Sequence, residues 1–204
     1  FNGGLFVRPD LSIIRENWLP LEAVQPVIDI LKHHKLDVWL YSDKDWFVPS
    51  RQGPHVDREE WTVKFPPIVV PGFDGLLDRV MKIVGVSDDL DAVARCEKDV
   101  QQERGEHVSA ARSQPYYLDV THPKANKGEV VSVLAKMLHV PTQNIATIGD
   151  MPNDVLMFKR SGVSIAMGNA SPEVQQAARF VTSSNKAEGF ALAMEQFVLR
   201  TQAA

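Results

Sequence analysis

The sequence predicts an α/β protein in two parts: an α+β part, then a Rossmann-like core with a parallel sheet, present only in part. Three observations lead to this expectation. From Tyr116 onward, short apolar strands alternate with helices, which is typical of a parallel sheet wrapped by helices. Residues 20–115 show paired strands with two or three helices instead. The 204 residues are enough for one large domain or two small ones, with a real hydrophobic core.

The composition argues against several classes of protein. The net charge of −4 does not fit a strongly basic surface for nucleic acid. No apolar run approaches the roughly 20 residues of a membrane span. Cys96 is the only cysteine, so neither an internal disulfide nor a multi-cysteine metal site is possible. We expect a cytoplasmic monomer or dimer without nucleic-acid or membrane partners.

The first residues read as the end of a strand that runs into a turn. Apolar residues flank Asn2-Gly3-Gly4, a pattern typical of a chain already in mid-fold. We therefore expect that an N-terminal piece is missing from the sequence. Two apolar runs follow, at residues 4–7 and 11–14, and Arg8-Pro9-Asp10 between them predicts a hairpin.

Residues 20–115 have the pattern of an α+β unit. Apolar residues recur at helical spacing after Pro20, and Ser87-Asp88-Asp89 is a strong helix start. The expected elements are helix 20–34, strand 38–41, turn 42–45, strand 46–48, a short charged helix or irregular segment 54–64, strand 79–84, helix 87–104, and strands 106–111 and 115–120.

The remaining residues are expected to form the parallel-sheet core, which begins with strand 117–120. Helix 127–139 should carry its apolar residues on one side: Val130, Val133, Leu134, Met137 and Leu138. Further strands are expected at 144–149, 163–166 and 180–182, with helices at 153–161, 171–178 and 189–200. Ligands of such sheets bind at the carboxyl ends of the strands, and Asp150 stands at such an end.

The segment that follows strand 144–149 carries the candidate chemistry, Gly149-Asp150-Met151-Pro152-Asn153-Asp154. The strand end fixes the Asp150 carboxylate at the mouth of the sheet, and Mg²⁺ prefers such oxygen ligands. Asn153 and Asp154 stand at a helix start, where they can cap the helix and face the same mouth. Read alone, the motif also fits residues that serve only as turn and cap.

Lys127 adds a second element to this motif. It opens a helix 23 positions before Asp150, a distance that one strand–helix–strand unit fits. A right-handed crossover brings both residues to the same edge of the sheet. A cation at a helix start opposes the helix dipole, which suggests that Lys127 neutralises an anion. The alternative is a solvated lysine.

Together these motifs resemble the core of Cof-type phosphatases of the haloacid dehalogenase superfamily. Lys127-Gly128 resembles the family's lysine motif, and residues 149–154 resemble its acidic motif. The segments 166–170, 177–178 and 181–182 resemble its next strand and helix, and the segment 184–189 resembles its late loop. By this resemblance residues 1–19 end the N-terminal core part and form a linker hairpin, residues 20–115 are an inserted type IIB α+β cap that sets specificity, and residues 116–204 complete the core.

The resemblance implies phosphoryl transfer from small phosphate monoesters such as sugar phosphates, nucleotides or cofactor phosphates. An Asp nucleophile would form an aspartyl-phosphate, and a second Asp would act as general acid and base. Asp150 would hold Mg²⁺, and Lys127 would bridge nucleophile and phosphate. Asn153 would touch the phosphate or the nucleophile loop, and Asp154 would orient the loops around it.

The chain departs from the family pattern at the nucleophile. The family motif Asp-x-Asp-Gly-Thr precedes an Asn-Gly turn like that at Asn2-Gly3, and it does not occur in these residues. Phe73-Asp74-Gly75 is a faint likeness that lacks the first Asp. We therefore expect residues 1–204 alone to be inactive. A non-catalytic metal- or anion-binding protein and a related phosphomutase remain as alternatives.

Substrate contacts outside the core are expected from the α+β part. The main candidate is Asp45, in the turn 42–45 between two strands, where it would overhang the site. Further candidates, each more simply explained as an ordinary surface residue, are Ser42, His55, His107, Arg112 and His122. The expected partner is a small phosphorylated metabolite.

Overall fold

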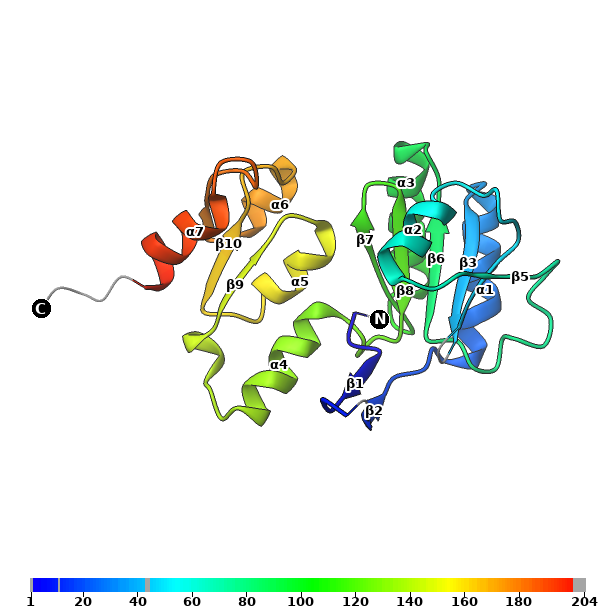
Figure 1. The fold of residues 1–204 in the computed structure, drawn as a ribbon, viewed down its shortest axis with the longest axis horizontal. Coiled ribbons are helices and arrows are strands. Elements are labelled where there is room, and N and C mark those ends of the chain that lie inside the picture. Colours follow the sequence, from blue (N-terminus) through cyan, green and yellow to red (C-terminus); the bar gives the residue numbers. More distant parts are fainter. Residues whose placement is uncertain (1, 11, 43–44, 200–204) are drawn as a thin grey trace, which may run out of the picture. The chain divides into compact units, whose positions relative to one another are not determined.

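The computed structural model describes residues 2–10, 12–42 and 45–199. The chain divides into two compact units, Phe1–Asn126 and Lys127–Ala204. Figure 1 labels the helices and strands of both units. Within the described residues, no helix is both long enough and apolar enough to cross a membrane.

The first unit begins with an antiparallel hairpin of β1 (Leu5–Val7) and β2 (Ile13–Glu16). The backbone N–H of Arg8 donates to the carbonyl of Ser12 at 2.9 Å, and this hydrogen bond closes the turn between the two strands. The predicted hairpin is therefore confirmed, with its second strand two residues later than expected. Residue 11, part of the expected strand, lies outside the described residues.

The main sheet of the first unit has six strands in the order β5-β4-β3-β6-β8-β7. All neighbouring pairs are antiparallel except β4 and β5. The strands are β3 (Asp37–Ser42), β4 (Asp45–Val48), β5 (Ile68–Val69), β6 (Lys82–Val86), β7 (Ser109–Gln114) and β8 (Tyr117–Thr121). Half of the turn predicted at 42–45, residues 43–44, lies outside the described residues.

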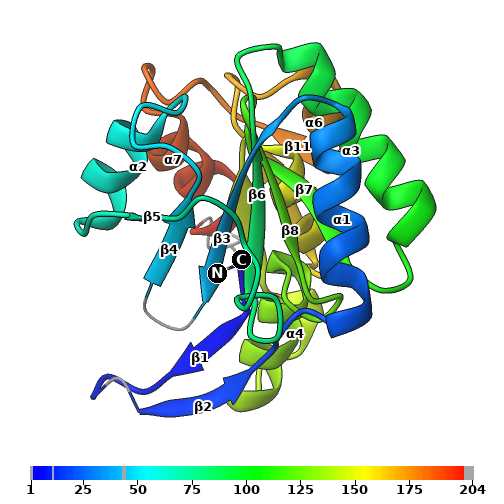
Figure 2. The ribbon, with the colours of Figure 1, turned by 90° about the vertical axis from the view of Figure 1, so that its right-hand side faces the viewer.

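Three helices cover the two faces of this sheet. Figure 2 shows α1 (Leu21–His33) and α3 (Leu90–Arg104) side by side on one face, and α2 (Val56–Val63) on the other. The helix start predicted at 87–89 is confirmed, because the Asp89 carboxylate accepts a hydrogen bond from Ala92 N at 2.9 Å. Such a cap satisfies an N–H group that the helix itself leaves unpaired.

Strand alternation explains why this sheet has a separate core on each face. Successive side chains point to opposite faces, so Val38 and Leu40 pack under α1 and α3, whereas Trp39 and Tyr41 pack on the side of α2. Cys96 is fully buried in the first of these clusters. Burial, then the charges of neighbouring acids, raises the pKa of its thiol to about 12, which rules out a reactive thiolate at neutral pH.

One strand lies in a different sheet from the one expected. The segment 117–120 was predicted to begin the parallel core, but β8 pairs antiparallel with β6 and β7 in the six-stranded sheet. The division between the compact units accordingly falls after Asn126, not at 115/116. The local pattern could not reveal this, because a fully buried strand is equally apolar in either kind of sheet.

The second unit contains the predicted parallel sheet. Its three strands run in the order β11-β10-β9, and both pairings are parallel. The strands are β9 (Ala146–Gly149), β10 (Val163–Ala166) and β11 (Phe180–Val181). The helices are α4 (Lys127–Met137), α5 (Val155–Phe158), α6 (Pro172–Ala177) and α7 (Gly189–Ala193), and α7 continues as a π-helical turn over Met194–Val198. The end of the predicted helix 189–200 lies outside the described residues.

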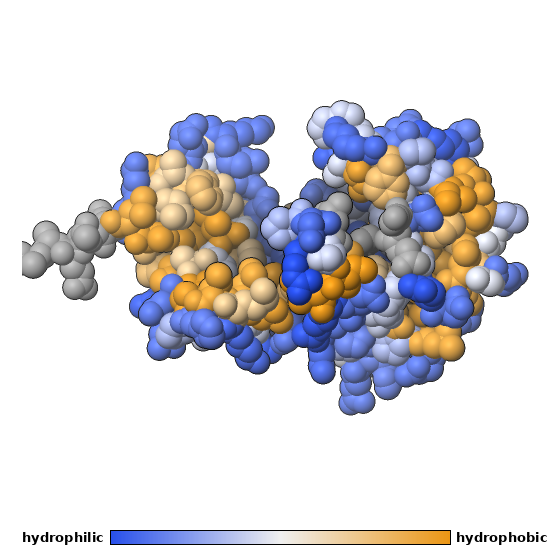
Figure 3. All heavy atoms as spheres, turned by 60° about the horizontal axis from the view of Figure 1, so that its bottom comes forward, coloured by the Kyte–Doolittle hydropathy of each residue, from blue (hydrophilic) through white to orange (hydrophobic). Residues whose placement is uncertain are grey.

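The side of α4 that is buried is not the side with the large apolar residues. The buried residues of the helix are Gly128, Val131 and Ala135. Leu134 and Met137 are exposed, as is Leu138 just beyond the helix. Within the described residues, α4 therefore packs through small side chains and leaves these larger apolar ones at the surface. Figure 3 shows a band of hydrophobic surface on this unit.

Candidate functional site

The site is built where β9 ends in the second unit. Gly149 is the last residue of the strand, and a short 3₁₀ turn, Pro152–Asp154, begins two residues after Asp150. The backbone therefore reverses within a few residues, and the polar side chains of the turn lie at the carboxyl end of the sheet. Asn153 and Asp154 are both buried, at 5% and 4% exposure, whereas Asn and Asp residues of ordinary surface turns are mostly exposed.

The Asp154 carboxylate holds this turn together. Its Oδ2 atom accepts hydrogen bonds from the backbone N–H groups of Asp150 and Met151, at 2.9 and 3.0 Å. Its Oδ1 atom accepts a hydrogen bond from Lys127 Nζ at 2.5 Å. Both oxygens are thus engaged within the protein, so Asp154 orients the loop that carries Asp150.

Lys127 reaches the turn from the start of α4. Besides its ion pair with Asp154, its ammonium group lies 3.3 Å from Asn153 Oδ1. The Lys127 side chain remains 36% exposed, whereas that of Asp154 is 5% exposed. The ammonium group is therefore held by Asn153 and Asp154 on one side and accessible to solvent on the other. The structure places Lys127, Asn153 and Asp154 in mutual contact, as the spacing of the motifs suggested.

The Asp150 carboxylate is positioned by a residue to which the sequence reasoning gave no role. Asn169 Nδ2 donates to Asp150 Oδ2 at 2.9 Å, and the backbone N–H of Asn185 donates to Asn169 Oδ1 at 2.9 Å. Asn169 lies three residues beyond β10, the parallel neighbour of β9. The rule that places ligands at the carboxyl ends of parallel strands would have found it.

These residues fit a magnesium site in part. Within the described residues, Oδ1 of Asp150 has no hydrogen-bond partner, and a carboxylate oxygen is the hard ligand that Mg²⁺ prefers. No group of three or more His, Cys, Asp or Glu residues in the described part of the chain could hold a metal ion by itself. Asp150 therefore fits a Mg²⁺ site that takes one protein carboxylate and completes its coordination with water and phosphate oxygens.

Gly149 is required by the packing of this turn. A Cβ atom added at this position would lie 2.4 Å from the Cβ and Cγ atoms of Asp154. We predict that Gly149→Ala destabilises the second unit by about 1–3 kcal/mol, because the buried carboxylate or the backbone must shift. Urea unfolding followed by far-UV circular dichroism measures this. Gly72→Ala is the matched control, since its added Cβ meets nothing within 4 Å. Equal stability of both variants would contradict the prediction.

The substrate-contact residues predicted in the first unit each have a different environment. Asp45 is exposed at the start of β4 and does not line the cavity of that unit. Ser42 is the partner of Asp45 in the antiparallel pair β3 and β4, and His107 is exposed. Arg112 forms an ion pair with Glu97 at 2.8 Å, which gives it a structural role.

The two remaining histidines also have partners. His55 Nε2 lies 2.8 Å from Asp88 Oδ1, and its ring stacks on Tyr116 at 4.0 Å. His122 Nδ1 accepts a hydrogen bond from the backbone N–H of Lys124 at 2.9 Å. Burial first, and then the charges of Lys124 and Arg15, lower the pKa of His122, so its ring is neutral at pH 7.

Comparison with known proteins adds to this geometry. The family model described as haloacid dehalogenase-like hydrolase matches residues 1–194. A Haemophilus influenzae protein named "Putative phosphatase" is 28% identical over 197 residues, which are 96% of this chain and 74% of that protein.

Solved structures agree in fold. A haloacid dehalogenase-like hydrolase from B. subtilis superposes with a TM-score of 0.81 at 20% identity, covering 97% of this chain and 78% of that one. A HAD subclass IIB sugar phosphatase superposes with a TM-score of 0.77, also at 20% identity, covering 96% of this chain and 73% of that one. At this level of identity the likeness shows the shared fold alone.

Proposed function

The chain belongs to the haloacid dehalogenase-like hydrolases, and from this premise we propose that it serves Mg²⁺-dependent hydrolysis of small phosphate monoesters through an aspartyl-phosphate. The observation that carries the proposal is the arrangement at the end of β9. An accessible ammonium group, Lys127 Nζ, is fixed by Asp154 in the same turn that presents the Asp150 carboxylate. A cation and a carboxylate held together suit a phosphate group and its counter-ion.

Each residue has a distinct part in this proposal. Asp150 would hold Mg²⁺ through Oδ1, while Asn169 keeps the carboxylate from rotating. The bound ion would offset the repulsion between the phosphate and an attacking carboxylate. Lys127 would donate to a phosphate oxygen from its accessible side, and the Asn153 side chain would orient the ammonium group. Asp154 is a positioning residue, since both of its oxygens are occupied within the protein.

The nucleophile is the part of the reaction that these residues do not carry. No Asp-x-Asp-Gly-Thr sequence occurs between Phe1 and Ala204. We predict that purified residues 1–204 alone do not release phosphate from p-nitrophenyl phosphate in the presence of Mg²⁺. Robust Mg²⁺-dependent turnover that disappears in Asp150→Asn would contradict this prediction.

A second assay tests the proposed activity itself. The full product of the reading frame that contains residues 1–204 is incubated with a panel of sugar phosphates and nucleotides, with Mg²⁺ or with EDTA. We expect hydrolysis that requires Mg²⁺ and produces inorganic phosphate. Isomerised sugar phosphate without phosphate release would indicate a phosphomutase, and the absence of any reaction would leave a protein that binds anions or metal without turnover.

The substrate is proposed as a small phosphorylated metabolite. We propose that Asp45, which is exposed in the first unit, contacts the part of the substrate that carries no phosphate. Asp45→Ala should raise KM and leave kcat nearly unchanged if it contributes binding alone.

A further inference from the structure

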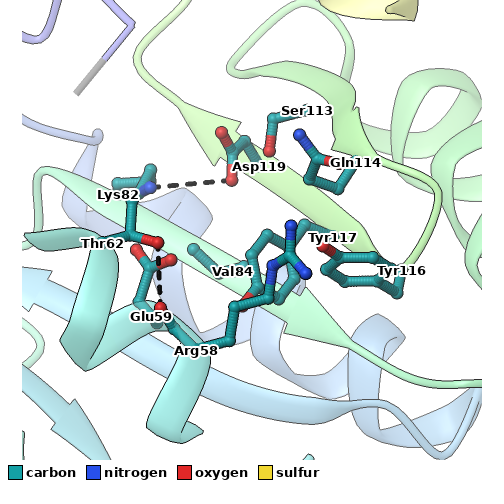
Figure 4. A pocket seen from close by; sticks show the side chains of 10 residues that line it. All are labelled: Arg58, Glu59, Thr62, Lys82, Val84, Ser113, Gln114, Tyr116, Tyr117 and Asp119. Atoms are coloured by element: carbon teal, nitrogen blue, oxygen red, sulfur yellow. Dashed lines mark hydrogen bonds and ion pairs between the residues drawn. The ribbon is translucent and has the colours of Figure 1, made fainter. Parts of the chain in front are cut away.

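Each unit of the chain has a hollowed surface, and the linings differ in charge. The cavity of the first unit, about 260 Å³ in volume, is lined by charges of both signs, and Figure 4 shows Lys82 and Asp119 facing one another in it. The second unit has two cavities of about 450 and 360 Å³, and both are lined by Ser132, Thr142 and Arg160. Because they share these residues, we describe them together as the α4 groove.

Backbone contacts hold the walls of the α4 groove in place. The groove lies between α4 and two loops, residues 140–143 and 159–162. The N–H of Gly162 in the second loop donates to the carbonyl of Thr142 in the first at 2.9 Å. A Cβ atom added at Gly162 would lie 2.0 Å from the carbonyl oxygen of Gln143, so the two loops touch through their backbones. The groove is therefore formed without a ligand, and binding requires little ordering of the chain.

The α4 groove lies at the amino ends of the parallel strands, away from the candidate metal ligand. The N–H of Val163, the first residue of β10, donates to the carbonyl of Ile145, directly before β9, at 3.1 Å. The lining residue Gly162 immediately precedes Val163. Asp150 follows the opposite end of β9, whose four residues span about 13 Å. A phosphate-sized group in the groove therefore cannot contact Asp150.

Positive side chains predominate in the α4 groove. Lys136, Lys159 and Arg160 line it, and among its described lining residues Glu129 is the one acid. Arg160 Nη2 donates to Glu129 Oε1 at 3.2 Å, but this ion pair is exposed and uses one of the five guanidinium N–H donors. Three positive charges and one negative charge give the lining a net charge of +2, although the whole chain carries −4.

We propose that the α4 groove binds a phosphate group, either as free inorganic phosphate or as part of an organic metabolite. A phosphate monoester carries about −1.5 to −2 charges at pH 7, which matches the charge of the lining. Arg160 offers a planar fork of donors, whereas Lys136 and Lys159 act as point charges. The exposed Thr142 hydroxyl adds a neutral donor. No residue with a role in the proposed hydrolysis lines the groove, so this proposal does not depend on that activity.

Direct titration tests the proposal without any requirement for catalysis. Inorganic phosphate, glucose 6-phosphate and AMP are added separately, without Mg²⁺, to the ¹⁵N-labelled full product of the reading frame that contains residues 1–204. Concentrations up to about 10 mM reach millimolar affinity, and uncharged glucose is the control ligand. We expect at least one phosphate compound to shift the amide resonances of Lys136, Thr142 and Arg160 saturably.

The ligands distinguish the two sources of the phosphate group. Tighter binding of glucose 6-phosphate or AMP than of inorganic phosphate would identify an organic phosphate as the ligand, and equal affinities would identify free phosphate. The proposal is wrong if the phosphate compounds shift only resonances near Lys127 and Asp150, or if glucose produces the same saturable shifts in the groove.

Two variants link binding to the charges of the groove. Lys136→Met and Lys159→Met each remove one positive charge from an exposed side chain and should weaken phosphate binding about three- to tenfold. Arg179→Met is the matched control, because Arg179 is exposed in the same unit but does not line the groove. Unchanged affinity in both lysine variants, or an equal loss in Arg179→Met, would overturn the proposal.

Discussion

Replacing Asp150 by Asn is expected to lower Mg²⁺-dependent phosphate release by about two to three orders of magnitude. The substitution keeps the size of the side chain but removes its negative charge and turns one carboxylate oxygen into an amide NH₂ group. Within the described residues, Oδ1 is the oxygen of Asp150 without a hydrogen-bond partner, so it is the atom available to the ion. An amide oxygen is a weaker ligand for a hard cation than a carboxylate.

This experiment uses the full product of the reading frame that contains residues 1–204. Activity is measured as a function of Mg²⁺ concentration, because loss of a metal ligand raises the concentration needed for half-maximal activity. Glu195→Gln, an exposed carboxylate of the same unit, is the matched control and should leave the Mg²⁺ dependence unchanged. If Asp150→Asn retains both its rate and its Mg²⁺ response, the metal assignment is wrong.

Asn169→Ala separates positioning from ligation. It removes the donor that fixes Asp150 Oδ2 but leaves the carboxylate itself in place. Its expected loss of rate, about tenfold, should therefore be smaller than that of Asp150→Asn. An effect as large as that of Asp150→Asn would mean that Asn169 itself touches the ion or the phosphate.

Replacing Asp154 by Ala is expected to destabilise the second unit by about 3 kcal/mol. The change leaves three donors without their acceptor: Lys127 Nζ and the backbone N–H groups of Asp150 and Met151. Lys127 can still turn its partly exposed ammonium group to water, which keeps the loss below that of a fully buried charge. The two backbone donors have no such alternative inside the turn.

The second unit must be followed separately in this measurement. All four Trp and all three Tyr residues lie before residue 118, so their fluorescence reports the first unit alone. Hydrogen exchange at the amides of Asp150 and Met151 reports the Asp154 bonds directly and should accelerate in Asp154→Ala. Lys127→Met combined with Asp154→Ala should cost less than the sum of the single changes, because the partners are in contact. Full additivity, or a loss below about 0.5 kcal/mol, would contradict the assigned role.

Much of the fold could be predicted because it depends on local patterns. Helical spacing placed α1, and the Asp89 cap placed the start of α3. The alternation of strands and helices predicted the parallel sheet of the second unit. The placement of β8 could not be predicted, since its buried residues suit either sheet, and only pairing with β6 and β7 decides between them.

The candidate site divides in the same way. The sequence by itself determined the polar cluster at the end of β9, since Lys127 and residues 149–154 are brought together by one helix and its flanking turn. Tertiary structure decided that both oxygens of Asp154 bind Lys127 and the loop, and that Asp150 Oδ1 has no hydrogen-bond partner among the described residues. Local spacing specifies which residues approach, but hydrogen-bond partners depend on side-chain orientation.

The cavity of the first unit depended wholly on tertiary structure. Arg58, Lys82 and Asp119 are far apart in the sequence and carry no motif. They meet because the order β6-β8-β7 and the register of β6 with β8 place alternate side chains on one face, beneath α2. Strand order and register are set by long-range pairing and burial, and these are the forces that a local sequence pattern does not contain.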